Sequence, residues 1–585
     1  MPVPRFTVPV GKLEDDLVWQ AISIIDGSKL LFTIGPWKDE ERAGGRPETF
    51  PIQALLVAMA VCAVTNQPML ATRFTEVLFR QISPTMRHAL GVPKPPGAHD
   101  DRGWDNCYRN VRTRFHGLMD LMDPSPAPKN RRLDADTFET QSEARRQERT
   151  DVEWTERGER LAWFINEVLE MSIRVLPRDV RRAWKGSAAV DATVIPAFAR
   201  PSRRVKRTKK GEKPATLRHS SDPDAGWYHR DKRETPDKEP ETKMSVWAYE
   251  ATLVVSGSDD PDQPSTVPTL VMAMAPLHKP AAQVGRNATR ALASIAERGH
   301  PAGYLAGDRA YTQAKAEDFQ LPARSLGYDL VLDYKITQLG HQGSHDGMVL
   351  VDGTWYCPGM PETLVNATLD FRKGLIDEAT HLARIEERRG HQIRPKARAD
   401  ADGHTRMRCP ASKPVPVVRC ELKPGSEGPA ATAKVRIPVT DVLRIHRPKV
   451  CTQESVTLPP EAGAKYAQAL PHESPEWHAT YATLRNSVEG MNGFVKDGAR
   501  EAIDDPERRR IRGVAPQSVL VAFQLFAANI RKIDEFLTKK AAEAKKVRKL
   551  PPRRRSKSIT TWAPATAATA GADDATGDPD PPLTA

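Results

Sequence analysis

Apolar residues follow two different rhythms along this chain. Short, nearly continuous apolar runs, typical of buried strands, cover residues 188–195, 246–255, 268–275, 304–307 and 328–334. Longer segments with an apolar residue every three or four positions, typical of helices, cover 161–176, 281–298, about 313–326, 477–496 and 516–540. The pattern predicts an α/β protein whose first strands follow one another directly and whose later strands alternate with helices.

The order of these segments also predicts the arrangement of the strands. Strands joined without a helix are expected to be antiparallel, and strands joined through helices are expected to be parallel. We therefore expect a mixed sheet flanked by helices, in which the strand at 188–195 lies beside the strand at 304–307.

The remaining patterns divide the chain into regions. Residues 51–82 contain two apolar stretches separated by a turn at 65–68, which fits an αα-hairpin better than a helix–turn–helix. The stretch 124–149 is polar, charged and rich in proline, which indicates a linker, whereas 341–470 has short alternating segments typical of strands. The predicted regions are a helical domain at 1–125, a linker with a helix at 126–184, a first sheet region at 185–340, a β-rich insertion at 341–470, a second helical part at 471–540, and a basic, then disordered tail at 541–585.

Composition narrows the class of protein and its partners. A length of 585 residues predicts several domains, and 87 Lys+Arg against 75 Asp+Glu gives a net charge of +12, which suits a polyanionic partner. The longest apolar run, 54–64, is well short of the ~20 residues that cross a bilayer, and the N-terminus lacks the apolar core of a signal peptide. Six cysteines do not suggest a disulfide framework, so we expect a cytoplasmic protein without a membrane partner.

Three carboxylates occupy positions suited to a metal ion. Asp191 lies in the first predicted strand, Asp308 directly follows the fourth, and Glu489 lies on the helix at 477–496. Ordinary alternatives exist: a strand-end turn for Asp191 and a helix N-cap for Asp308. If the two aspartates are neighbours in the sheet, however, their repulsion favours a cation between them.

The helix that carries Glu489 has two adjacent faces. Leu484, Val488, Met491 and Val495 form a predicted buried stripe, while Arg485, Glu489, Asn492 and Lys496 follow the same rhythm one residue later. A carboxylate flanked by cations suits a metal ion and a phosphate group. The alternative is a surface ion pair between Arg485 and Glu489, worth only ~0.3–0.5 kcal/mol.

Together these segments resemble a known family. SAAVDATVIPA around Asp191, GYLAGDRAYT around Asp308 and TLRNSVEGMNGFVK around Glu489 are similar to segments of bacterial insertion-sequence transposases of the DDE class. One branch has a β-rich insertion and a Y-x2-R-x3-E-x6-K pattern, which Arg485, Glu489 and Lys496 match in spacing. The tyrosine departs from the pattern, because position 482 is alanine and Tyr481 comes one residue early. SDPDAGWY at 221–228 adds to the resemblance, which covers about 185–535.

The resemblance implies a fold, an activity and roles for residues. The expected catalytic domain is ribonuclease-H-like, with Asp191, Asp308 and Glu489 binding two Mg²⁺ ions that Mn²⁺ can replace. Arg485 and Lys496 are expected to contact DNA phosphates, and the N-terminal helical domain to bind the DNA ends. The implied activity is cleavage at terminal inverted repeats and strand transfer into target DNA by a nucleoid-associated homodimer, with no small-molecule substrate. The alternatives are a nuclease without strand transfer and a catalytically silent DNA-binding protein.

Two basic stretches add candidate DNA contacts. The connection after the first strand carries Arg203, Arg204, Lys206, Arg207, Lys209 and Lys210. The tail carries a second cluster at 545–557. Either can follow a DNA backbone or simply be solvated.

Four of the cysteines fall inside the predicted insertion: Cys357, Cys409, Cys420 and Cys451. Four thiols can form a structural zinc site, but the C-x2-C pairs typical of such sites are absent. Unrelated free cysteines are therefore the preferred interpretation.

Overall fold

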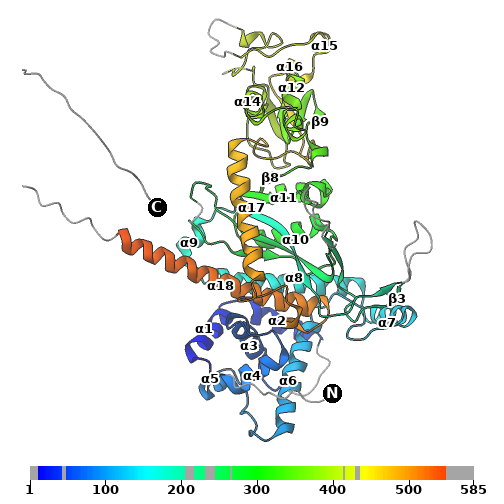
Figure 1. Cartoon of the computed structure of the whole chain (residues 1–585), viewed down its shortest axis with the longest axis vertical. Helices are drawn as coiled ribbons and strands as arrows, with labels where there is room; N and C mark the ends of the chain where they lie inside the picture. Colours follow the sequence, from blue (N-terminus) through cyan, green and yellow to red (C-terminus); the bar gives the residue numbers. More distant parts are fainter. Residues whose placement is uncertain are drawn as a thin grey trace, which may run out of the picture. The chain divides into compact units, whose positions relative to one another are not determined.

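The computed structural model describes residues 11–41, 48–204, 216–230, 244–263, 266–412, 416–427 and 435–547. In these ranges a helical region comes first, followed by a mixed sheet with helices and by smaller antiparallel sheets (Figure 1). The helices of the first region are α1 (Asp15–Asp26), α2 (Leu30–Glu41), α3 (Ile52–Val64), α4 (Ala71–Glu76), α5 (Pro84–Ala89), α6 (Asp101–Asp120), α7 (Ala135–Gln147), α8 (Asp151–Ile173) and α9 (Arg178–Ala183).

The N-terminal helices form as their apolar pattern predicts. Helix α3 is apolar on all sides and every residue from Ala54 to Ala63 is buried, as expected of a helix surrounded by others. The predicted turn at 65–68 separates it from α4, and Asn66 takes the left-handed conformation there with φ 57°. No single helix in the described ranges is long and apolar enough to cross a membrane, and one bent pair, α1 with α2, meets the criteria only by length and composition.

The predicted linker at 124–149 is partly wrong, because it contains helix α7. This helix buries none of its residues, so it has no apolar stripe that a sequence pattern could reveal. Its N-cap, Asp134, accepts a hydrogen bond from the backbone N–H of Thr137. Helix α8 then starts earlier than its apolar pattern, at a capping box formed by Thr150 and Glu153.

The large sheet has the predicted mixed arrangement. Its path is β4-β5-β1-β7-β8, with β6 also paired to β5. Strands β4 (Gly226–Arg230), β6 (Val271–Met274) and β1 (Ala188–Pro196) are antiparallel to β5 (Met244–Ser256). Strands β1, β7 (Tyr304–Gly307) and β8 (Asp329–Leu332) are parallel to one another. The prediction that the first strand of the sheet lies beside the strand at 304–307 is confirmed.

Helices that come before and after the 341–470 segment in the chain cover this sheet. Helix α10 (Val284–Glu297) packs on β5 and β6, and α11 (Gln320–Ser325) packs on β8. Helix α17 (Pro475–Lys496) packs across β1, β5, β7 and β8 (Figure 1, orange). One continuous core joins the N-terminal helices, a face of the sheet, α17 and the first part of α18 (Val514–Val547).

The segment at 341–470 is mixed, so the prediction of a mostly β insertion is only partly right. One antiparallel sheet contains β9 (His341–His345), β10 (Met348–Val351) and β11 (Thr354–Tyr356), and another contains β12 (Arg394–Pro395), β13 (Thr405–Arg408) and β14 (Val456–Leu458). Helices lie between these strands: α12 (Glu362–Val365), α13 (Ala367–Arg372), α14 (Glu378–Arg388), α15 (Asp441–Ile445) and α16 (Lys449–Thr452). The buried positions of α14 are His381, Ile385 and Arg388, so its inner face does not look apolar in the sequence.

The C-terminal helix is longer than predicted. Helix α18 continues to Val547, into the region expected to be a tail from 541. The predicted disordered tail after that point, and most of its basic cluster, lie outside the described residues.

Candidate active site

Asp191 and Asp308 are neighbours in the sheet. Val190 on β1 pairs with Gly307 on the parallel strand β7, so the next residue of each strand is one of the two aspartates. Side chains alternate between the two faces of a sheet. Ala189 and Ala306, each two residues earlier, both belong to the core that contains α17. The two carboxylates therefore belong to the face that α17 covers.

The carboxylate of Asp191 lies in an environment that opposes its charge. Burial raises its pKa, Arg485 lowers it and the nearby charge of Asp308 raises it again, with a net upward shift. Asp308 is half-buried, and its Oδ1 accepts the backbone N–H of Ala310 at 2.8 Å. This aspartate begins a turn before a short 3₁₀ segment, so the expected alternative of an α-helix N-cap is replaced by a tight turn.

Helix α17 brings three polar side chains to this pair. Arg485 Nη1 lies 3.4 Å from Asp191 Oδ1, and its Nε lies 2.9 Å from Glu489 Oε1. Asn492 Nδ2 donates a hydrogen bond of 3.0 Å to Asp191 Oδ2. Arg485 therefore links the carboxylate on the strand to the carboxylate on the helix.

The buried stripe of α17 holds the helix against the sheet. Leu484, Val488, Met491 and Val495 are all buried, as their spacing predicts. Where the chain leaves β5, Gly257 allows the helix to come close, because a Cβ added there would lie 2.4 Å from Leu484 Cδ2. The close approach places Arg485 and Asn492 within reach of Asp191.

The three predicted metal ligands do not form one compact group. Glu489 is half exposed and points to Arg485, with 56% of its side-chain area accessible. One polar atom beside Asp191, Asn492 Oδ1, is buried and accepts no hydrogen bond within the protein. Such an atom needs a partner, so the chemistry of this site fits a polar ligand or a hydrated cation.

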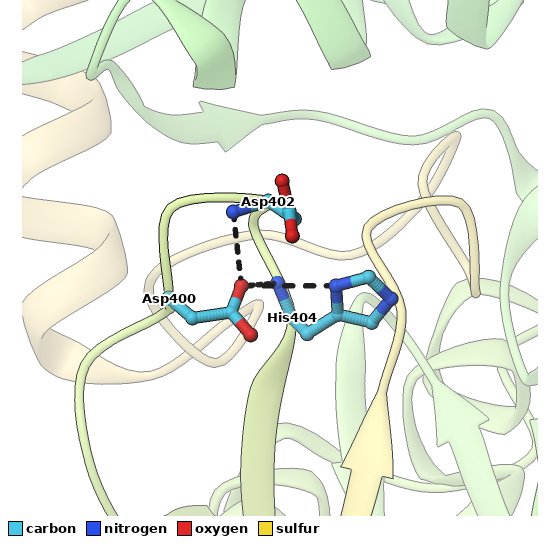
Figure 2. A group of neighbouring side chains, drawn as sticks. All are labelled: Asp400, Asp402 and His404. Atoms are coloured by element: carbon cyan, nitrogen blue, oxygen red, sulfur yellow. Dashed lines mark hydrogen bonds and ion pairs between the residues drawn. The ribbon is translucent and has the colours of Figure 1, made fainter.

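The one set of three ligand atoms lying within 4.8 Å of one another, in the ranges that the structure describes, is elsewhere: Asp400, Asp402 and His404 (Figure 2). Asp400 Oδ1 accepts the backbone N–H groups of Asp402 at 3.1 Å and of His404 at 2.8 Å. This carboxylate already stabilises an exposed turn between β12 and β13. The group is therefore explained by the turn and is no evidence of a metal site.

Tyr481 and Lys496 lie at either side of Glu489 on α17. Tyr481 is half-buried and stacks on Trp477, with ring centroids 4.6 Å apart and 8° between the planes. Burial raises the pKa of its hydroxyl, and the charges of Asp333 and Asp308 raise it further. The displaced tyrosine is thus close enough to the carboxylates to feel their charge, whereas Lys496 is half-buried at the end of the helix.

Two features near the pair were not predicted. Glu250 interrupts the apolar strand β5; burial raises its pKa, and the charges of Asp191 and Asp308 raise it further. It pairs in register with Val194, which lies three residues after Asp191 on β1; because this separation is odd, Glu250 belongs to the other face of the sheet. Arg309 forms an ion pair of 2.6 Å with Asp333 after β8 and so fixes the turn next to Asp308.

The predicted basic connection is described only in part. Arg203 and Arg204 form strand β2, which pairs with β3 (Thr216–Arg218) and brings Arg203 opposite Arg218. Lys206, Arg207, Lys209 and Lys210 lie outside the described residues. This two-stranded ribbon is separate from the large sheet, so the structure does not bring Arg203 into the carboxylate pair.

A hollow of about 390 Å³ lies beside this ribbon. It is lined by residues of the ribbon and of the SDPDAGWY segment, with Lys279 and the aromatic side chains of His219, Trp227, His229 and Trp247. Cationic and aromatic side chains together suit the phosphates and the bases of a nucleic acid.

Comparison with known proteins adds no relative: no family model, no curated protein and no solved structure matches this chain.

Proposed function

We propose that this protein is a metal-dependent DNA transposase that cuts at the terminal inverted repeats of an insertion sequence and joins the freed ends to target DNA. The observation that carries the proposal is the pairing of Val190 with Gly307, which makes Asp191 and Asp308 neighbours on one face of the sheet. A mixed sheet with antiparallel β6-β5-β1 and parallel β1-β7-β8 is compatible with the ribonuclease-H-like fold that the resemblance implies.

Two Mg²⁺ ions, or Mn²⁺ in their place, would be held by Asp191, Asp308 and Glu489. When bound they supply an activated water or 3′-hydroxyl and stabilise the leaving oxygen. The donor set supports this assignment, since all three side chains offer hard oxygen ligands. The raised pKa of Asp191 describes a carboxylate whose charge lacks sufficient compensation within the protein.

The other polar side chains of α17 position the site and bind substrate. Asn492 holds Oδ2 of Asp191 and leaves Oδ1 facing Arg485. In the DNA complex Arg485 exchanges its two carboxylate partners for a phosphate, to which its planar group is well matched. Lys496, two helical turns beyond Glu489 on α17, contacts the same DNA strand.

Double-stranded DNA is the proposed partner. A homodimer of this protein, associated with the nucleoid in the cytoplasm, would bind it. The net charge of +12, the Arg203–Arg218 ribbon and the neighbouring hollow support an anionic polymer as substrate. The N-terminal helical domain would bind the ends of the element.

Two other functions use the same residues differently. A nuclease of the same fold would cut DNA without joining it, and a silent relative would bind DNA without cutting. The joined product separates the first from a transposase, and any metal-dependent cut separates the second.

The experiment supplies the purified chain with duplexes that carry the inverted repeats flanking its own gene, a target plasmid, and Mg²⁺, Mn²⁺ or EDTA. We expect nicked and joined products with either metal and none with EDTA. Asp308→Ala should abolish both products, while Asp262→Ala, at an exposed turn beyond β5, should leave both unchanged. Undiminished cutting by Asp308→Ala would refute the proposal.

A further inference from the structure

The four cysteines of the 341–470 segment lie together. They come from four different places: Cys357 follows β11, Cys409 follows β13, Cys420 lies in the next connection and Cys451 lies in α16. All four are buried, unoxidised members of one core cluster. The four cysteines are free, as predicted, but they share one core although 94 residues separate the first from the last.

Three of these cysteines share one local geometry. Each begins a tight turn in which its carbonyl accepts the N–H three residues later: Met360 for Cys357, Ser412 for Cys409 and Lys423 for Cys420. In each turn the backbone N–H of the second residue after the cysteine points at the cysteine sulfur. These donors belong to Gly359, Ala411 and Leu422. For Cys357 this donor lies 3.4 Å from Sγ.

These N–H groups favour sulfur that carries negative charge. A neutral thiol is a weak acceptor, whereas a thiolate gains a charge-assisted hydrogen bond from each donor. The first turn also excludes larger residues: a Cβ at Gly359 would lie 2.6 Å from Ile437 Cγ2 and 2.8 Å from the carbonyl oxygen of Pro438. The close packing at Gly359 thus holds the backbone N–H of Gly359 where it reaches the sulfur of Cys357.

The sulfurs also interact with one another. The Cys357 and Cys409 sulfurs share a hydrogen bond. Cys451 is within electrostatic range of both Cys409 and Cys420, and the ammonium of Lys423 lies near Cys409 and Cys451.

We propose that Cys357, Cys409, Cys420 and Cys451 bind one structural Zn²⁺ ion as thiolates. Tetrahedral coordination with Zn–S bonds of about 2.3 Å requires sulfurs roughly 3.8 Å apart. No three of these sulfurs lie within 4.8 Å of one another in the described part of the chain, so tetrahedral binding would require them to approach one another. Four protons leave as the thiolates form, and no electron is transferred.

A zinc ion would supply what this segment lacks. Its core is small and unites two short three-stranded sheets with the loops that carry Cys409 and Cys420. Four ligands from four separate places would tie β11, β13 and α16 to one point, as metals do in small domains. The site is separate from the carboxylates of the proposed catalytic centre, because all of its ligands belong to a different core cluster.

The test measures metal bound to the full-length chain, purified under reducing conditions from cells grown with zinc and then freed of loosely bound ions. We expect about one zinc per chain by mass spectrometry of the metal. Cys409→Ser and Cys451→Ser should each lose most of it. Cys107→Ser, a half-buried cysteine outside the cluster, and Asp308→Ala should each keep it.

A second measurement does not depend on how well the variants fold. The wild-type chain is stripped of metal and reconstituted with Co²⁺, whose visible absorption reports tetrahedral thiolate ligands. A tetrahedral all-thiolate spectrum that Zn²⁺ abolishes supports the proposal. A spectrum without thiolate ligands, a chain that binds iron in preference to zinc, or a Cys357–Cys409 disulfide in the reduced preparation would each overturn it.

Discussion

Asn492 on helix α17 donates a hydrogen bond of 3.0 Å to the Oδ2 of Asp191 on strand β1, a residue 301 positions earlier in the chain. The bond joins the two most distant parts of the proposed catalytic centre. It leaves the other oxygen of Asp191 to Arg485, 3.4 Å away, which in turn contacts Glu489. Helix α17 therefore determines both the charge and the orientation of the first aspartate.

Removing Arg485 should affect cutting more than folding. Arg485→Ala deletes the cation between Asp191 and Glu489 and the proposed phosphate contact. We expect the nicking rate to fall by about 10²–10³, the usual effect of losing one preorganised charge at a reaction centre. Arg485→Lys should recover little, because an ammonium cannot replace the two-pronged contact. The control is Arg286→Ala on α10, which breaks an exposed ion pair between Arg286 and Asp318; equal rates for both alanine variants would contradict the role.

The fit of α17 against the sheet should be sensitive to one added methyl group. Gly257→Ala places a Cβ 2.4 Å from Cδ2 of Leu484, which is fully buried and can move only by displacing its neighbours. We expect a loss of about 1–3 kcal/mol in the free energy of unfolding and a lower nicking rate. Gly490→Ala, on the same helix with open space around it, should instead raise stability by up to about 1 kcal/mol. Denaturant unfolding of both variants measures the difference, and a stabilised Gly257→Ala would contradict the packing argument.

The SDPDAGWY segment predicts a dependence of stability on pH. Burial raises the pKa of Asp222 to about 7, although the hydroxyl of Tyr249 donates to it at 2.5 Å and lowers the pKa in part. The folded chain therefore holds this proton more tightly than the unfolded chain, whose aspartate loses it near the ordinary value of 3.8. As pH rises from about 4 to about 7, this group alone should lower the free energy of unfolding by at most ~1.4 kcal/mol per pH unit.

Asp222→Asn removes that proton and should flatten this part of the profile. Melting temperatures of the wild type and the variant should diverge in favour of the variant as pH rises towards 7. Parallel profiles over this range would show that Asp222 is already charged in the folded chain.

In the 341–470 segment, the buried pair of Arg388 and Asp352 should be essential to local stability. Their side chains are 2.7 Å apart and almost fully buried, and Arg388 also donates to the carbonyl oxygens of Leu364 and Val365. Arg388→Ala leaves a buried charge without its partner, so we expect a loss of about 3–5 kcal/mol. Limited proteolysis should then cut this segment first. The double variant Arg388→Met with Asp352→Asn, which keeps an acceptor for the N–H of Gly340 and tolerates the left-handed backbone at 352, should recover much of the loss, and a single variant as stable as the wild type would contradict the prediction.

The sequence predicts the sheet because its strands carry strong local patterns. The runs at 188–195, 246–255 and 304–307 form β1, β5 and β7 nearly as predicted, and their connections determine which pairs are antiparallel. The stripe from Leu484 to Val495 predicts the inner face of α17 for the same reason. Where one face is apolar, the period of the pattern is sufficient.

The features that the sequence did not predict lack such a pattern. Helix α7 buries no residue, and α14 turns His381 and Arg388 inward, so neither shows an apolar stripe. The convergence of Cys357 and Cys451 depends on the tertiary fold of a whole segment and leaves no short spacing to detect. Glu250 did leave a signal, a single charge within the apolar strand β5, that could have drawn attention to its place beneath the aspartates.

If Asp191, Asp308 and Glu489 hold the metal ions that cut DNA, a change of ligand at Asp308 should change which metal ion supports cutting. Asp308→Cys replaces a hard oxygen with a sulfur that Mg²⁺ binds poorly and Mn²⁺ accepts more readily. We expect that nicking of the element's ends by this variant is lost with Mg²⁺ and partly restored with Mn²⁺, while Asp262→Cys cuts with both metals. Wild-type cutting by Asp308→Cys with Mg²⁺, or equally low cutting with both metals, would contradict this expectation.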